Sequence, residues 1–251
     1  MENFFELILI IIFGAIFGSY ATLFAYRLPR QESCFGRYFG KKSRCPNCGR
    51  TLITRELIPL INWIITFGKC RSCKSKIPRI HFFIEFSTTL LFVICYLNFG
   101  FTEIFIIKSM IAVVMIVAIA CDITHKKFTH EVLNFLLVFI VIDRILHDKQ
   151  LINIVYSGLL GVILSVIFYK VICQKYRDIF ANDVQIFDYI KFILIASVAL
   201  DYQSFLYYFF EVALILSLLF VFNIAGKRKI IALGYVFILP LLWMLIIQPI
   251  N

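Results

Sequence analysis

The chain has 251 residues, of which 61% are hydrophobic and 28 are phenylalanine, and its mean hydropathy is +0.91. A soluble domain of this length is usually about half apolar, so this composition would leave too much apolar surface in water and excludes an ordinary soluble protein. The formal net charge of +10 fits either nucleic-acid binding or the basic loops of a membrane protein, and its distribution along the chain decides between them.

Eight apolar runs reach or approach the length of about 20 helical residues that crosses a bilayer. We expect membrane spans at 4–26, 81–98, 104–121, 132–146, 152–173, 190–200, 205–224 and 231–247. The chain starts with the acidic sequence MENFFEL, and no small-residue cleavage site follows the first run. We therefore interpret this run as a retained span rather than a signal peptide.

The predicted fold class is an all-α polytopic membrane protein of about eight transmembrane helices. Its expected parts are a first transmembrane helix (1–26), a small cytosolic loop (27–80) and a seven-helix membrane domain (81–251). The loop holds 13 of the 25 lysines and arginines. Because positively charged loops stay in the cytoplasm, we predict a multi-pass protein of the plasma or inner membrane, with both termini outside. The charge then reflects topology, and no nucleic-acid partner is expected.

Two Cys-x-x-Cys pairs stand in this basic loop, Cys45-Pro-Asn-Cys48 and Cys70-Arg-Ser-Cys73. Four thiolates on two tight turns predict a tetrahedral, zinc-ribbon-like site for structural zinc. Such a closed site has no open coordination position for catalysis. Disulfides are disfavoured in a cytosolic loop, but four free thiols, a redox pair and a four-sulfur iron site remain as alternatives.

Two aspartates lie at the ends of expected spans on the cytoplasmic side. Asp122 ends the run IAVVMIVAIACD, and Asp183 lies in IFANDVQIF before the sixth span. Taken singly, each is most simply a solvated helix-end charge, and Asp183 also suits the N-cap of a following helix. Together, two carboxylates that share a proton are the machinery of an aspartic protease. The spacing of the two residues does not show that they meet.

Several longer motifs occur in a specific order along the chain. They are GSYATLFAYRLP from Gly18, then CPNC, RELIPLINW, GKCRSC and IPRIHFFIEFSTTLLF, and finally IALGYVFILP near the C-terminus. In this order and content the chain resembles the bacterial type IV prepilin peptidases (prepilin leader peptidase/N-methyltransferase) over nearly its whole length. Glu85 falls at the glutamate of that family's second span, and Gly234 at the glycine that opens its last span.

The resemblance implies a membrane aspartic endopeptidase that removes the short basic leader of type IV prepilins or pseudopilins at the cytoplasmic face of the bilayer. It implies that Asp122 and Asp183 are the catalytic pair. Many members of the family also methylate the new N-terminus with S-adenosylmethionine, so this cofactor is expected if that second activity is retained. No Rossmann-type glycine fingerprint for it is present.

The chain departs from the family pattern around the second aspartate. Phe180 and Asn182 stand at the two glycine positions that precede Asp183, and Gln185 replaces a lysine. Asp188 is close by and is an alternative second acid.

The first motif also departs, since Thr129-His130 replaces the usual proline-aspartate pair. Two other functions therefore stay open, a catalytically impaired member that acts in pilus or secretion assembly and a proton-coupled transporter. Against the transporter, no carboxylate lies near the middle of an expected span. Asp143 and Glu211 lie nearer the outer ends, where interfacial or paired groups are expected.

Overall fold

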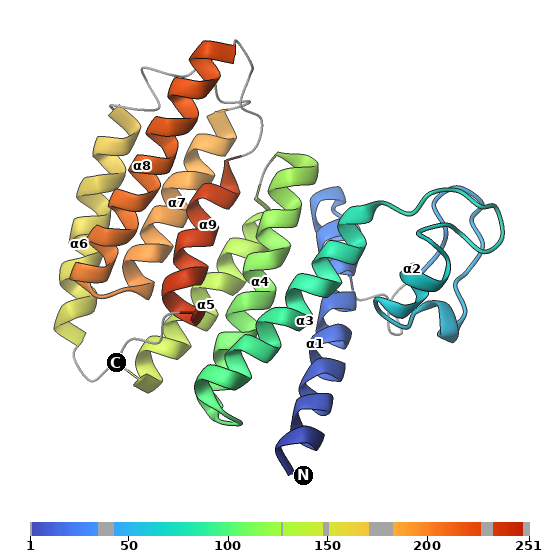
Figure 1. The fold of residues 1–251 in the computed structure, drawn as a ribbon. Helices are drawn as coiled ribbons and strands as arrows, with labels where there is room; N and C mark the ends of the chain where they lie inside the picture. The colour runs from blue at the N-terminus through green and yellow to red at the C-terminus, as the bar shows by residue number, and fades with distance from the viewer. Residues whose placement is uncertain are drawn as a thin grey trace. The chain divides into compact units, whose positions relative to one another are not determined.

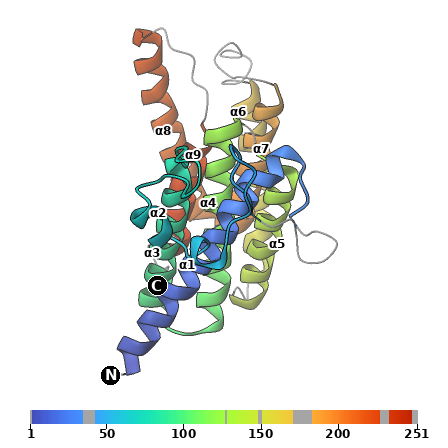
Figure 2. The ribbon, with the colours of Figure 1, turned by 90° about the vertical axis from the view of Figure 1, so that its right-hand side faces the viewer.

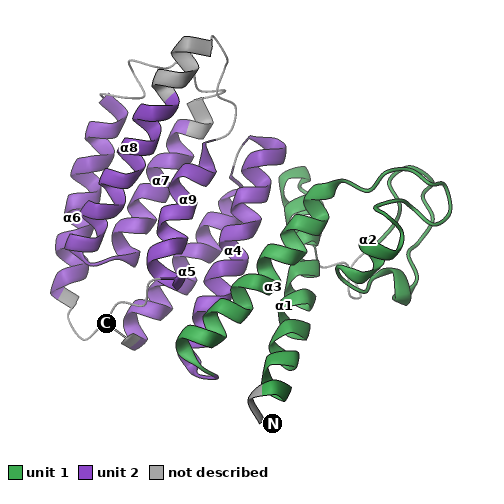
Figure 3. Ribbon diagram, in the orientation of Figure 1, with its two compact units in different colours: residues 1–100 green, residues 101–251 purple. Residues whose placement is uncertain are grey.

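The computed structural model describes residues 2–34, 43–126, 128–147, 151–170, 183–226 and 233–247. The chain divides into two compact units, Met1–Gly100 and Phe101–Asn251 (Figure 3). The described ranges are mostly α-helix and contain no β-strand, only two isolated bridges in the loop of the first unit. The all-α prediction is therefore confirmed for the part of the chain that is described.

The first unit is a pair of long helices joined by the cysteine loop, which lies to one side of the pair (Figure 1). In chain order its elements are α1 (Glu2–Arg27), the short turns η1 (Leu28–Arg30) and η2 (Thr54–Glu56), α2 (Ile61–Ile65) and α3 (Arg79–Phe99). Helices α1 and α3 pack against each other, and the Trp63 ring of α2 contacts Phe82, so α2 lies beside the start of α3 (Figure 2). The hydroxyl of Tyr96 donates to Glu6 Oε2 at 2.5 Å, which joins the two long helices near their far ends.

Two glycines set the distance between α1 and α3. A Cβ atom on Gly14 would lie 2.9 Å from the Thr89 Cα, and one on Gly18 would lie 2.8 Å from the Glu85 Cα. The glycines are four residues apart and so lie on one face of α1, opposite residues that are also four apart on α3. Such small-xxx-small faces let helix backbones approach closely in membranes, where packing replaces the hydrophobic effect.

The second unit is a helical bundle in which α4 is the most buried of the membrane-length helices. Its elements are α4 (Glu103–His125), α5 (His130–His147), α6 (Leu151–Phe168), α7 (Asp183–Ala199), α8 (Tyr202–Gly226), α9 (Gly234–Leu242) and the π-helical turn η5 (Trp243–Ile247). Helix α4 packs on α5 and α9, while α7 packs on α5, α6 and α9. The elements that pack around α4 are therefore brought together from distant parts of the sequence.

One ion pair joins α4 and α5 inside this unit. Lys108 Nζ donates to Asp143 Oδ2 at 2.8 Å, with side chains 14% and 8% exposed. The expectation that Asp143 is a paired group is thus confirmed. A buried carboxylate without such a partner would carry a large desolvation cost.

Four described helices are long and apolar enough to cross a bilayer, Phe4–Arg30, Arg79–Phe99, Glu103–His125 and Tyr202–Leu219. They support a membrane protein, but the expected eight spans are not confirmed. Helices Ile152–Phe168 and Gly234–Ile247 are apolar but shorter. Helix α7 has 17 residues, which is about 26 Å and less than the roughly 30 Å of hydrocarbon.

We predict that Gly14→Ala and Gly18→Ala each destabilise the protein by about 1–3 kcal/mol, because the new methyl group meets backbone atoms of α3 that cannot rotate away. Thermal unfolding in detergent measures this. Gly158→Ala in α6 is the matched control, since a Cβ there meets nothing within 4 Å. It should be neutral or stabilising by up to about 1 kcal/mol. Equal effects of all three substitutions would contradict the close packing of α1 on α3.

Candidate functional site

Asp122 lies in the last turn of α4 and is only 1% exposed. Its Oδ2 atom accepts a hydrogen bond of 2.6 Å from the backbone N–H of Gly234, the first residue of α9. The N-terminus of a helix carries a partial positive charge that favours an anion. Asp122 is therefore an internal carboxylate held by the start of another helix, not the solvated helix-end charge that its position in the sequence also suggested.

Gly234 is required at this contact because no larger residue fits. A Cβ atom there would lie 2.5 Å from Phe128 Cζ and 2.7 Å from Asp122 Oδ2. The glycine thus lets the backbone donor reach the carboxylate directly. The sequence marked Gly234 as a family position but gave no sign of this role.

Aromatic side chains surround the carboxylate. Tyr189 of α7 stacks on Phe237 of α9, with ring centroids 5.0 Å apart, and meets Phe128 edge-on at 5.9 Å. The Tyr189 hydroxyl accepts from the Leu233 N–H at 3.1 Å and lies beside the Asp122 carboxylate. Tyr189 thereby aligns α7 and the start of α9 around Asp122. No sequence pattern had singled it out.

A second buried carboxylate lies within electrostatic range of Asp122. Asp188 of α7 is 1% exposed, and the charges of the two aspartates interact. Its Oδ1 lies 3.9 Å from Nζ of Lys191, one turn further along the helix. That Nζ also lies 3.2 Å from Nδ1 of His130, the first residue of α5. Lys191 therefore lies within reach of both Asp188 and His130, on the helix whose Tyr189 lies beside Asp122.

Asp183, the other expected catalytic residue, is the first residue of α7. Its side chain lies outside the described part of the structure, as do Phe180 and Asn182. The predicted pairing of Asp122 with Asp183 therefore stays a prediction. What the structure does describe is that α7 begins with Asp183 and carries Asp188 and Tyr189 to the Asp122 site.

The cysteine loop is built from two similar turns. Each Cys-x-x-Cys pair is enclosed by one antiparallel bridge, Arg44 with Thr51 and Lys69 with Lys76. In each turn the residue after the second cysteine has a positive φ, +69° at Gly49 and +59° at Lys74. Its N–H donates to the carbonyl of the first cysteine, at 2.9 and 3.0 Å.

The two turns bring the four sulfur atoms of Cys45, Cys48, Cys70 and Cys73 within 4.8 Å of one another, so the cluster could hold a metal ion. The Sγ atoms of Cys45 and Cys73 are 3.8 Å apart. A tetrahedral ion with bonds of about 2.3 Å to sulfur would separate its ligands by about 3.8 Å. The cysteine residues expected from the spacing are thus brought together in a geometry that fits zinc.

Neighbouring donors favour thiolates at this cluster. Hydrogen bonds from the Ser75 hydroxyl and then the Asn47 amide lower the pKa of Cys73 to about 5. Backbone N–H groups of Cys48 and Asn47 lower the pKa of Cys45. The pKa of Cys48 rises to about 11 even though the Arg50 N–H acts to lower it, because desolvation and the adjacent thiols outweigh that bond. A divalent cation would relieve this crowding of like charges.

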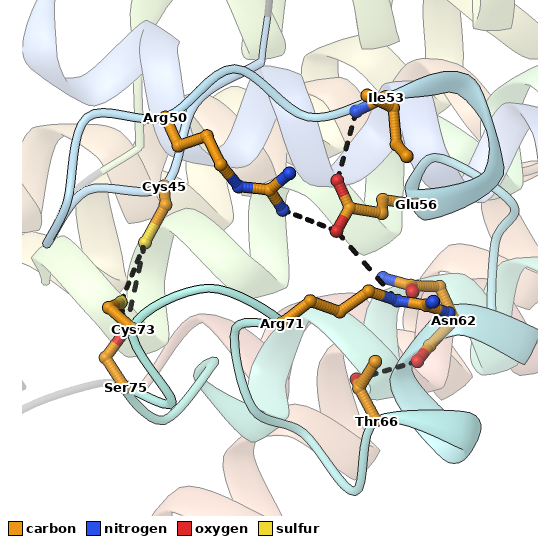
Figure 4. A network of polar contacts seen from close by, with 9 residues as sticks. All are labelled: Cys45, Arg50, Ile53, Glu56, Asn62, Thr66, Arg71, Cys73 and Ser75. Carbon is orange, nitrogen blue, oxygen red and sulfur yellow. Dashed lines mark hydrogen bonds and ion pairs between the residues drawn. The ribbon is translucent and has the colours of Figure 1, made fainter.

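A buried salt bridge braces the loop beside the cluster (Figure 4). Glu56 has a side chain 3% exposed and accepts from Arg50 at 2.5 Å and from the Ile53 N–H at 3.1 Å. Nε of Arg71, the residue after Cys70, lies 3.9 Å from Glu56 Oε1. The Ile53 N–H and then the arginines hold the pKa of Glu56 below its usual range. This carboxylate therefore links the two cysteine turns to each other.

The sequence matches the Bacterial Peptidase A24 N-terminal domain over residues 12–99. It is 31% identical to the prepilin leader peptidase/N-methyltransferase of Bacillus subtilis over 188 residues, which are 74% of this chain and 73% of the relative. The chain belongs to the prepilin leader peptidase/N-methyltransferase family. Relatives of the same name from Vibrio cholerae and Myxococcus xanthus are 31% and 30% identical over 41% and 47% of this chain, and 43% and 34% of their own lengths. No solved structure matches the chain.

Family membership confirms the resemblance that the motifs indicated, and it connects the chain with prepilin processing in general terms. The matched domain covers α1 from residue 12 onward, the cysteine loop and α3. The Asp122 site lies in the other unit of this peptidase-family chain, where α4, α7 and α9 meet.

We predict that Gly234→Ala destabilises the protein by about 1–3 kcal/mol, because the added methyl group overlaps both Phe128 and the Asp122 carboxylate. Denaturant or thermal unfolding in detergent measures the cost. Phe128→Leu shortens one of the two obstructing side chains. The loss of unfolding free energy in the double variant should then be smaller than the sum of the two single losses by at least about 0.5 kcal/mol. Strict additivity would mean that Phe128 does not restrict the space at Gly234.

Proposed function

We propose that the protein is a membrane aspartic endopeptidase that cleaves the short basic leader of type IV prepilins or pseudopilins at the cytoplasmic face of the bilayer. The observation that carries this proposal is the buried Asp122 carboxylate, fixed by the first N–H of α9. It occurs in a chain of the prepilin leader peptidase family. The loop charge supports the cytoplasmic orientation of the 27–80 segment.

In this proposal Asp122 is the ionised member of a carboxyl pair. The Gly234 N–H and the start of α9 stabilise its negative charge. Its other oxygen, Oδ1, is buried and has no hydrogen-bond partner among the described residues, so it is suited to accept a proton from a water molecule. The water oxygen attacks the scissile carbonyl carbon while the second, neutral carboxyl protonates the carbonyl oxygen. Collapse of the tetrahedral intermediate then breaks the C–N bond: the amine leaves with the proton that Asp122 took from water, and the second carboxylate regains its proton from a hydroxyl of the intermediate.

The second carboxyl is assigned to Asp183 by its place in the family motif. Asp188 is the alternative, because it is buried and electrostatically coupled to Asp122. Its Oδ1 lies 3.9 Å from Lys191 Nζ, so Asp188 already has a charged neighbour on its own helix. We assign the acid to Asp183 and a positioning role to Asp188, and the variants below distinguish the two assignments.

The test is cleavage of a prepilin with a basic leader by the purified, detergent-solubilised protein. Asp122→Asn and Asp183→Asn should each lower the cleavage rate by at least about 100-fold, since general acid–base catalysis contributes about that much or more. Asp188→Asn keeps the size of the side chain and should retain cleavage within about tenfold. All three variants should unfold at temperatures close to that of the wild type, which separates lost chemistry from a lost fold.

Each outcome of this assay has a distinct meaning. Loss of cleavage in Asp188→Asn together with full cleavage in Asp183→Asn would mean that Asp188, not Asp183, is the proton donor. Folded wild-type protein that cleaves no prepilin would favour the catalytically impaired member acting in assembly. Proton-linked uptake without any change in pilin size would instead favour the transporter.

We further propose that the four cysteines hold one structural zinc ion. The purified wild type should contain about one equivalent of zinc by mass spectrometry, and Cys70→Ser should lose it, because a three-cysteine site is incomplete. Cys34→Ser removes a cysteine outside the cluster and should keep the metal. Iron in place of zinc would show a four-sulfur iron site. A folded wild type without metal would show that the four cysteines are free thiols.

We also propose that the protein methylates the new N-terminus with S-adenosylmethionine, because its relatives are named prepilin leader peptidase/N-methyltransferase. Transfer of a labelled methyl group to the cleaved pilin measures this activity. It should persist on a pre-cleaved pilin with Asp122→Asn, since that variant removes only the proteolytic step. Absence of label on pre-cleaved pilin with the wild type would limit the protein to proteolysis.

A further inference from the structure

The short helix α2 presents an apolar face that the described residues of its own unit leave exposed. Ile61, Ile64 and Ile65 of this helix are 53–61% exposed, and Phe67 directly after it is 85% exposed. Leu57 and Ile58, just before the helix, are also exposed. Positions 61, 64 and 65 share one side of a helix. Apolar residues gathered on one side of a short segment differ from the scattered exposed residues of an ordinary surface.

The opposite side of α2 is fixed to the start of α3. The ring of Trp63 lies 4.9 Å from that of Phe82 between centroids. Gly68 packs against the same indole, where a Cβ would lie 2.8 Å from a ring carbon. The N–H of Leu60 donates to Glu85 Oε2 at 2.8 Å. The orientation of the apolar face is therefore set by specific contacts to α3.

These contacts define the depth of α2 relative to the membrane. Helix α3 begins at Arg79 and is one of the helices long and apolar enough to span a bilayer. Its contact residues Phe82 and Glu85 lie within six residues of that start, which is about 9 Å along the helix. Segment α2 is thus held level with the end of a span, at the depth of lipid headgroups and the first acyl carbons.

The charge around α2 matches a lipid surface. Residues 43–79 hold eight lysines and arginines but one acidic residue, Glu56, which is buried in its ion pairs with Arg50 and Arg71. The apolar surface also continues onto α3, where exposed Phe83 and Phe86 both contact the ring of Phe82. An apolar face with basic flanks is the pattern of segments that lie in the membrane interface and bind anionic lipids.

We propose that α2 and Phe67 form an interfacial anchor: Ile61, Ile64, Ile65 and Phe67 insert into the headgroup–acyl boundary of the leaflet where α3 begins, and the surrounding basic residues contact anionic headgroups. The cysteine cluster is thereby held against the membrane surface. This proposal depends on the membrane location of α3 and not on peptidase activity, so either one can fail without the other.

The test places the photoreactive residue p-benzoyl-L-phenylalanine at position 67 of the full-length protein in nanodiscs of phosphatidylethanolamine and phosphatidylglycerol. Irradiation followed by mass spectrometry should find lipid attached to the peptide that contains position 67. The same residue at Ser72, exposed in the second cysteine turn, is the control and should give at least about fivefold less lipid adduct. Asp122→Asn should give the same adduct as the wild type.

A second measurement covers the case in which crosslinking is inefficient. Phe67→Trp adds an emitter to a protein with two native tryptophans, and this added emission should be quenched by lipids brominated near the headgroup but not by aqueous iodide. Quenching by iodide alone would mean that the face is in water. Crosslinks from position 67 to residues 101–251, or to a second copy of the chain, would mean that protein covers it. Each of these results would overturn the lipid anchor.

Discussion

Helices inside a bilayer gain little from burying apolar side chains against one another, because lipid tails are as apolar as those side chains. Close backbone approach and a few well-placed polar contacts must hold them instead. Both units of this chain use these two devices. Gly14 and Gly18 bring α1 against α3, while Gly234 brings the N–H at the start of α9 to the carboxylate of α4.

The Asp122 site follows from the same constraint. A carboxylate in apolar surroundings needs donors, and most donors of a helix are occupied by its own carbonyl groups. The first N–H groups of a helix are the exception, and the start of α9 supplies one of them. Tyr189 adds a hydroxyl beside the same group and stacks on α9. The site thus combines a buried carboxylate with the contacts that hold α4, α7 and α9 together.

Parts of this structure that depend on local patterns could be predicted from the sequence. The first three spans were expected at 4–26, 81–98 and 104–121, and the helices run over Glu2–Arg27, Arg79–Phe99 and Glu103–His125. The cysteine cluster was also predicted, because Cys-x-x-Cys spacing fixes its own turn geometry.

Other features depend on contacts that no local pattern encodes. Asp122 and Gly234 are 112 residues apart, and Tyr189 directly precedes the expected span at 190–200 without belonging to any motif. Helix α4 continues for one turn beyond the apolar run and so takes Asp122 inside the bundle. The apolar runs at 132–146 and 190–200 predicted two further spans. The helices that contain these runs, α5 and α7, also carry charged residues, and α7 has 17 residues. Neither helix is therefore among those long and apolar enough to cross a bilayer.

The order of the loop elements along the chain has a consequence for how the protein is made. The four cysteines of the cluster and the Arg50–Glu56 salt bridge all precede Arg79, the first residue of α3. Chains emerge from the ribosome with their N-terminal parts first, so the whole cysteine cluster leaves the exit tunnel before α3 does. The contacts within the cluster need no residue of the later helices, whereas the bond from Leu60 to Glu85 must await α3. Folding can therefore proceed in two stages, the cysteine loop first and its attachment to α3 afterwards.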